Sequence, residues 1–212
     1  GSIAGDLLTL TGGVVNVDGT YQVVQTNLSG GPALNLNRAV TTTLNLAGGN
    51  VGGSGHLTWT GTSSWSGGAF VGSGTTIIEP GATVDVTSNS NKGIDRTLQN
   101  QGTMNYTGTR LLFGLIANVS GTLENQAGGV LNIDGDGDFG PNFNPGHQFI
   151  NDGTITKTGD AESIISVPFS NGGSVDIQQG TLRLDQGGTH AGSFQTSGTG
   201  NLRFLGGTHT IT

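Results

Sequence analysis

The densest group of potential metal ligands in this chain is a short acidic run. Asp134, Asp136 and Asp138 alternate with glycines in the sequence DGDGD. Carboxylate oxygens on a flexible backbone suit Ca²⁺, so these three aspartates are the candidate metal site. An EF-hand loop starting at Asp134 would need glycine at position 139 and glutamate at position 145, where the chain has Phe139 and Pro145. A solvated acidic bend is the competing interpretation.

Aromatic side chains indicate a second kind of site, because an exposed ring can stack on a sugar ring. Trp59 and Trp65 lie close together in the sequence LTWTGTSSW. Trp59 occupies an inward position of the repeat described below, so Trp65 is the candidate for glycan contact. Phe139 and Phe143 form a second candidate contact patch, in a segment that does not match the repeat.

Catalytic chemistry finds little support in the residue pattern. A glycan-cleaving protein needs carboxylates, or Ca²⁺ with a basic residue, converging on one groove. The four histidines show no metal-ligand spacing, neither GxSxG nor HExxH occurs, and there is no cysteine. We therefore predict a non-catalytic protein without a cofactor. The charged residues that would have to converge are Asp85, Asp95, Arg96, Arg110 and the three aspartates named above.

These residues are embedded in an internal repeat. The unit is glycine, any residue, apolar, any, apolar, any, glycine, and its period of two is that of a strand with one buried face. Lys157 breaks the alternation in one copy, where it either extends its amine toward solvent or lies at a corner. The copies are GVVNVDG (13–19), GHLTWTG (55–61), GTMNYTG (102–108), GVLNIDG (129–135), GTITKTG (153–159) and GNLRFLG (200–206).

A second signature precedes several of these strands and contains an asparagine followed closely by glycine. Asn100, Asn125, Asn151 and Asn171 recur at intervals of 25, 26 and 20 residues. Asparagine and glycine tolerate positive φ, so the motif predicts a corner of the chain. Stacked turns would place these four side chains ~4.8 Å apart, which predicts a ladder of hydrogen bonds.

A solenoid explains this spacing better than a sandwich does. A sandwich pairs strands through hairpins of differing length and gives no reason for a unit repeated every 20–26 residues. No window shows the 3.6-residue apolar stripe of a helix. The sequence therefore predicts an all-β solenoid, with segments 87–96 and 137–147 as loops that project from it.

The composition agrees with a thin core repeated along an axis. Glycine contributes 41 residues and proline 5, hydrophobic residues make up 32% and charged residues 10%. The net charge of −7 disfavours binding to nucleic acid. No run approaches the ~18 apolar residues of a membrane span, so membrane insertion is not expected.

Several phrases carry a family resemblance, among them LTWTGTSSWSGG (57–68), RTLQNQGTMNYTG (96–108) and FSNGGSVDIQQGTLRL (169–184). They resemble the Gly/Thr/Asn-rich β-solenoid repeats of very large bacterial surface and adhesin-like exoproteins, in the style of filamentous haemagglutinins and autotransporter passengers. The resemblance covers about three quarters of the chain, more loosely before His56. It implies secretion to the bacterial cell surface and a stalk or adhesive role. It brings no catalytic residues.

The predicted fold is thus an all-β, right-handed parallel β-helix (β-solenoid) of about nine coils of 20–26 residues. The hand follows from the resemblance and from the general preference for right-handed crossovers. We assign residues 3–212 to one domain, a fragment of a longer repetitive protein, and residues 1–2 to the remnant of a removed tag. The expected partners are glycans or a host or neighbouring cell surface, and end-to-end self-association is a further expectation.

Two alternatives to a structural or adhesive role remain open. A carbohydrate-binding or carbohydrate-cleaving β-helix should show exposed aromatic rings beside carboxylates on one lateral face, whereas a stalk should show Thr, Asn and Ser there. An ice-binding β-helix would need a Thr-x-Thr pair on every adjacent coil, and neighbouring coils replace it here; Thr is also common on exposed strands. The pairs are Thr9/Thr11, Thr58/Thr60/Thr62, Thr154/Thr156/Thr158 and Thr208/Thr210/Thr212.

Overall fold

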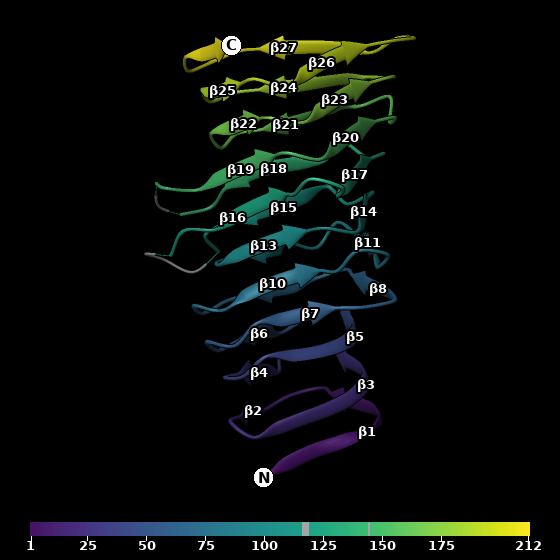
Figure 1. The fold of residues 1–212 in the computed structure, drawn as a ribbon, viewed down its shortest axis with the longest axis vertical. Helices are drawn as coiled ribbons and strands as arrows, with labels where there is room; N and C mark the ends of the chain where they lie inside the picture. The colour runs from purple at the N-terminus through teal and green to yellow at the C-terminus, as the bar shows by residue number, and fades with distance from the viewer. Residues whose placement is uncertain (116–118, 144) are drawn as a thin grey trace.

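The computed structural model describes residues 1–115, 119–143 and 145–212. Its regular structure is entirely β: the described residues form 28 strands and no helix. The strands stack in parallel, turn upon turn, from the N-terminus at one end of the molecule to the C-terminus at the other (Figure 1). The prediction of an all-β parallel β-solenoid is therefore confirmed.

Each turn contributes one strand to each of three faces, which the chain visits in the order I, II, III. Face I contains β7 (Leu57–Trp59), β10 (Thr75–Ile78), β13 (Thr97–Asn100), β16 (Thr122–Asn125), β19 (Gln148–Asn151), β22 (Phe169–Asn171), β25 (Gly188–His190) and β28 (His209–Ile211). Face II contains β8 (Thr62–Trp65), β11 (Thr83–Val86), β14 (Thr103–Tyr106), β17 (Val130–Ile133), β20 (Thr154–Lys157), β23 (Ser174–Ile177) and β26 (Ser193–Thr196).

Face III forms a separate ten-stranded sheet. It contains β2 (Val14–Val17), β4 (Ala33–Leu36), β6 (Asn50–Gly52), β9 (Gly68–Phe70), β12 (Lys92–Ile94), β15 (Arg110–Phe113), β18 (Asp138–Pro141), β21 (Glu162–Ile165), β24 (Thr181–Leu184) and β27 (Asn201–Phe204). Faces I and II are joined near the N-terminus by three longer strands, because β5 pairs with β7 through its first part and with β8 through its last. These are β1 (Ser2–Leu10), β3 (Thr20–Leu28) and β5 (Val40–Leu46).

The solenoid has about ten turns, close to the predicted nine. The difference arises near the N-terminus, where the turns are shorter than the asparagine spacing suggests. Val14 pairs with Ala33, 19 residues on, and Ala33 pairs with Asn50, 17 residues on. Because these turns use fewer residues, the chain forms one more turn than predicted.

The core is a column of inward side chains that continues through all turns. Trp59, Trp65 and Phe70 meet in one cluster, with ring centroids 4.9–6.2 Å apart. Further along, Phe139 and Phe149 continue an aromatic stack, 5.5 Å apart. Alternate residues of most strands are buried, so each turn packs its apolar side chains on those of the next.

The two segments predicted as loops each contain a strand of face III, which corrects that prediction. Segment 87–96 contains β12 and segment 137–147 contains β18. Both strands are held in the stack by a fully buried side chain, Lys92 in the first and Phe139 in the second.

At the asparagine corner Gly128 has the expected positive φ, and the other glycines have a second physical reason. Gly129, Gly153 and Gly173 do not have positive φ. A Cβ on Gly153 would lie 2.3 Å from the carbonyl oxygen of Gly129, and one on Gly173 would lie 2.1 Å from that of Gly153. Glycine is required there because successive turns approach each other too closely for a side chain.

Candidate functional site

The four spaced asparagines lie one above the other inside the corner between faces I and II, as their spacing in the sequence predicts. Each ends a face I strand, and the strand register pairs each with the next. All four are buried. The side-chain nitrogen of each donates to the side-chain oxygen of the next, at 2.8 Å from Asn100 to Asn125, 2.7 Å from Asn125 to Asn151 and 2.7 Å from Asn151 to Asn171.

The same nitrogens also join face I to the following turn of face II. Asn100 donates to the backbone carbonyl of Val130 at 2.9 Å, and Asn171 donates to that of Ser193 at 3.1 Å. Asn125 and Asn151 make the equivalent bonds to Thr154 and Ser174. Both amide hydrogens of Asn100, Asn125 and Asn151 are thus used inside the protein, so this asparagine ladder has a structural role.

The outer surface of face II carries polar ladders of its own. Asn132 donates to Asn105 at 2.9 Å, and Asn105 donates to Asp85 at 2.8 Å. A neighbouring outward column is built from Thr and Ser, with Val130 as the exception. Its members are Thr62, Thr83, Thr103, Val130, Thr154, Ser174 and Ser193. This lateral surface has the Thr, Asn and Ser composition expected of a stalk.

The Thr-x-Thr pairs do not share one face. Thr58 lies on β7 of face I and Thr62 on β8 of face II, with Thr60 in the turn between them. Thr154 and Thr156 lie on face II, whereas Thr210 lies on face I. On face II the residue two places after the outward threonine is usually Asn, Asp or Ser rather than Thr.

Two of the three candidate glycan-contact residues are buried. Trp65 and Phe139 are each 0% exposed, so their rings belong to the core and offer no surface to a sugar. Ser63 and Trp65 are the two buried residues of β8, and the half-buried Ser64 lies between them. Phe143 is 51% exposed and is the one candidate that reaches the surface. Its backbone carbonyl lies 2.7 Å from Nε2 of His147.

The three aspartates of the acidic run do not converge. Asp134 and Asp136 are exposed, and Asp138 is half-buried on β18 opposite Arg110. Burial raises the pKa of Asp138, and the charge of Arg110 opposes that rise. In the described part of the chain no group of three or more His, Asp or Glu side chains is arranged to hold a metal ion.

One of the protein's own lysines lies near the acidic run. Lys157 is an inward residue of face II and is fully buried, and its ammonium donates to the carbonyl of Gly159. Burial lowers the pKa of Lys157, while Asp134, Asp160 and Asp136 raise it. The signal in the sequence was the break in alternation at Lys157; in the structure β20, which contains Lys157, pairs with β17, which precedes the acidic run.

A second buried lysine closes the turn between β11 and β12. Nζ of Lys92 donates to the carbonyls of Thr87, Ser88 and Ser90 at 3.0, 2.9 and 2.7 Å. Burial lowers the pKa of Lys92 to about 8. All three ammonium hydrogens have an acceptor, which explains how a charged side chain occupies an inward position.

Apart from Arg110 and Asp138, which lie opposite each other on face III, the charged residues considered for catalysis lie on different sides of the solenoid. Asp85 faces outward on face II, Arg110 lies on face III, and Asp95 and Arg96 are buried after β12. Arg96 donates through Nε and Nη2 to Oγ1 of Thr76, at 2.9 and 2.5 Å. Burial lowers the pKa of Arg96 to about 10. These side chains do not form one acid–base pair.

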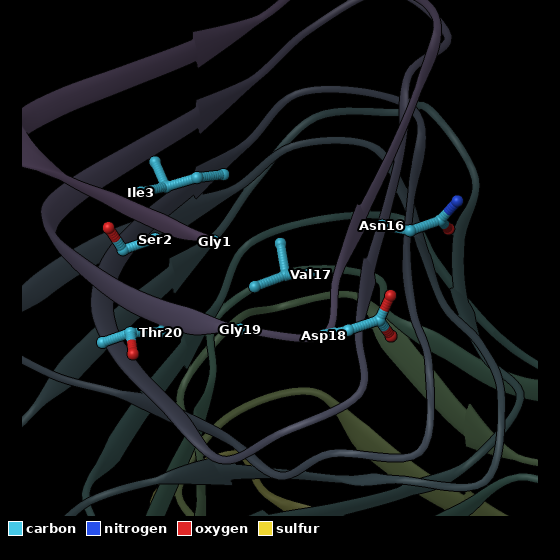
Figure 2. A pocket seen from close by; sticks show the side chains of 8 residues that line it. All are labelled: Gly1, Ser2, Ile3, Asn16, Val17, Asp18, Gly19 and Thr20. Carbon is cyan, nitrogen blue, oxygen red and sulfur yellow. The ribbon is translucent and has the colours of Figure 1, made fainter.

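The surface depressions are small and open. The one in Figure 2, of about 280 Å³, lies between β1, β2 and the start of β3. Asp18 is its one carboxylate, and Oδ1 of Asp18 accepts a hydrogen bond from Asn37 at 2.7 Å. The labelled side chains in Figure 2 include no histidine or basic residue that could act with Asp18. The residues lining this depression are Gly1, Ser2, Ile3, Asn16, Val17, Asp18, Gly19 and Thr20.

Comparison of the chain with protein-family models, with curated proteins and with solved structures found no match in any of the three. Within the described ranges there is no helix with the length and apolar character needed to cross a bilayer.

Proposed function

We propose that this chain is a non-catalytic rod, a structural or adhesive segment of a secreted bacterial surface protein that serves as a stalk or display scaffold. The observation that carries the proposal is the combination of a stack fixed from inside by the asparagine ladder with lateral faces built from Thr, Asn and Ser. A spacer needs rigidity along its axis and an unreactive surface.

The hydrogen bonds between turns run along the axis of the rod and support its stiffness. Three faces of parallel strands join each turn to the next, and their register is continuous from β10 to β28 on face I. Ten turns at a strand spacing of ~4.8 Å correspond to a rod ~45 Å long. Repeats that contact only their neighbours let such a rod be any length.

The bacterial surface location rests on the resemblance of the repeat phrases to adhesin-like exoproteins. The absence of cysteine and the low content of charged residues fit a rod that is stabilised by the packing of its turns and by hydrogen bonds between them. Glycans or a neighbouring cell surface are the partners we propose for an adhesive role, and end-to-end contact between rods is the self-association that open strand edges favour.

The carbohydrate-binding alternative is less well supported. It requires exposed rings beside carboxylates on a lateral face, and among the described residues the exposed aromatic side chains are Phe143 and Phe204. Phe143 lies after β18, and Phe204 ends β27 of face III, three turns further along, so the two exposed rings do not form one patch.

Two measurements test the rod. The chain has no cysteine, so Gln22→Cys and Gln195→Cys provide two exposed labelling positions near opposite ends. We expect one narrow distance distribution between the two labels, because a stiff rod holds them apart; a broad distribution contradicts the scaffold role. A glycan array with Phe143→Ala as the control then separates stalk from lectin, since binding that depends on Phe143 would support the alternative.

A further inference from the structure

Two histidines on adjacent strands of face I form a hydrogen-bonded pair. His190 ends β25 and His209 begins β28. Nε2 of His190 lies 3.0 Å from Nδ1 of His209, and Nε2 of His209 lies 3.0 Å from the carbonyl oxygen of Gly206. His190 is fully buried, in the position of the column that follows Asn171.

These contacts fix where the protons are. The carbonyl of Gly206 can only accept, so Nε2 of His209 carries a hydrogen. Nδ1 of neutral His209 is therefore the acceptor, and Nε2 of His190 donates to it. Nδ1 of neutral His190 is left without a hydrogen, buried and with no hydrogen-bond partner among the described residues.

Among the described residues, none with a charge opposite to a protonated His190 is in contact with it. Three phenylalanine rings enclose it: Phe169 of β22, Phe194 of β26 and Phe204 of β27, with centroids 5.1–6.0 Å away. His209 is the titratable group that faces it from β28. The charged residue of β27, Arg203, pairs with Glu162 at 3.1 Å instead.

A proton has no favourable place in this pair. On Nδ1 of His190 it would create a buried charged donor without an acceptor. On Nδ1 of His209 it would either turn two donors toward each other across 3.0 Å or move the hydrogen of His190 to its buried Nδ1, where no described residue accepts it. Both protonated forms therefore favour separation of the rings.

We propose that His190 and His209 form an acid-sensitive latch that holds β28 on the solenoid at neutral pH and releases it when the pair takes up a proton. The strand it holds is short, three residues paired with β25. Release uncovers the edge of β25 together with Phe204, and such an edge can pair with another strand. The latch is a property of the fold beyond the rod role proposed above.

The direction of the pH effect follows from the buried histidine. Burial, and to a lesser extent the neighbouring His209, lower the pKa of His190 below its ordinary value of 6.5. The neutral pair thus stabilises the closed state fully above pH 6.5, and this stabilisation is lost as pH falls through the lower value in the folded state.

Amide NMR spectra between pH 8 and pH 4.5 test the latch. We expect the amide signals of residues 206–212 to move to unfolded positions below about pH 6.5, while those of β13 and β16 stay in place. His190→Asn should abolish the transition, because asparagine is the residue that fills this column in the four preceding turns. His56→Gln, at an exposed histidine, should leave it unchanged.

A second variant keeps the proposal testable if His190→Asn does not fold. His209→Gln keeps one acceptor and one donor without a group that titrates in this range. Its 206–212 signals should stay in folded positions throughout. The latch is overturned if the wild-type signals do not move, or if both variants fold at pH 8 and still show the wild-type transition.

Discussion

The side-chain nitrogen of Asn125 donates to the side-chain oxygen of Asn151 across 2.7 Å, in the interior of the solenoid. The same nitrogen donates to the carbonyl of Thr154 at 3.0 Å. One amide thus joins two turns on face I and two faces at once. Because the relationship recurs through four turns, the corner is held by directional bonds as well as by apolar packing.

Removing one member of this ladder should be costly. Asn125→Ala leaves the oxygen of Asn151 and the carbonyl of Thr154 without their side-chain donor, and a buried group left unsatisfied costs ~1–3 kcal/mol. We expect the free energy of unfolding, measured by urea denaturation, to fall by at least that amount. Asn105→Ala is the matched control, since it cuts an outer ladder whose groups water can satisfy. Equal losses in the two variants would contradict an internal role.

Trp65 should behave as a core residue. Trp65→Ala removes a fully buried ring that contacts Trp59 and Phe70, and such a truncation costs ~3–5 kcal/mol. Phe143→Ala, at an exposed ring, should change the free energy of unfolding by less than ~0.5 kcal/mol. Thermal and urea unfolding of both variants check the difference. If Trp65→Ala were as stable as wild type, the assignment of Trp65 to the core would be wrong.

Lys92 should make stability depend on alkaline pH. Burial lowers its pKa to about 8 from 10.5, so between these values the unfolded chain holds more protons than the folded one. Stability contributed by this group therefore rises as pH increases from 8 to 10.5 and is lost as pH falls back through 8.

Lys92→Met is the comparison for this effect. It removes the titrating group and leaves the carbonyls of Thr87, Ser88 and Ser90 without their donor, so it should be less stable than wild type at pH 7. Its free energy of unfolding should lack the alkaline rise attributed to Lys92, while contributions from other groups remain in both proteins. Parallel curves for the two proteins from pH 7.5 to pH 10.5 would rule out the assignment.

Calcium should not stabilise the chain. Asp134, Asp136 and Asp138 are not gathered around one point, and the buried ammonium of Lys157 already lies near the first two. We expect the midpoint of thermal unfolding to be the same with Ca²⁺, with Mg²⁺ at equal ionic strength and with a chelator. A rise in the unfolding midpoint that is specific to Ca²⁺ would show that the acidic run binds this metal.

The repeat predicted the architecture because stacking imposes its own periodicity on the chain. Alternation around Met104 and Leu131 defines inward faces, and the interval between Asn100 and Asn125 measures one turn. The pattern could not predict whether residues outside the repeat unit face the core or the solvent. Trp65 follows a run of serines, so its face depended on the register of β8 with β11.

Lys92 shows why segment 87–96 was predicted as a loop, and Lys157 shows the same kind of inward charge. Sequence patterns treat a charged residue at an inward position as an interruption. Lys92 and Lys157 occupy such positions because backbone carbonyls only two to five residues away along the chain accept their hydrogens. The backbone turns that bring these carbonyls to the ammonium groups form with the fold, and the alternation of apolar residues does not predict them.

The asparagine ladder runs in one direction only, since the backbone carbonyls that share its donors fix which way each amide points. Its first member, Asn100, pairs in register with Ile78, and the buried Oδ1 of Asn100 has no donor among the described residues. Starting a ladder thus leaves one buried oxygen without a hydrogen bond, whereas every further turn with an asparagine adds one side-chain hydrogen bond. Elongation is then easier than initiation, which favours few long ladders over many short ones in any solenoid built on this motif.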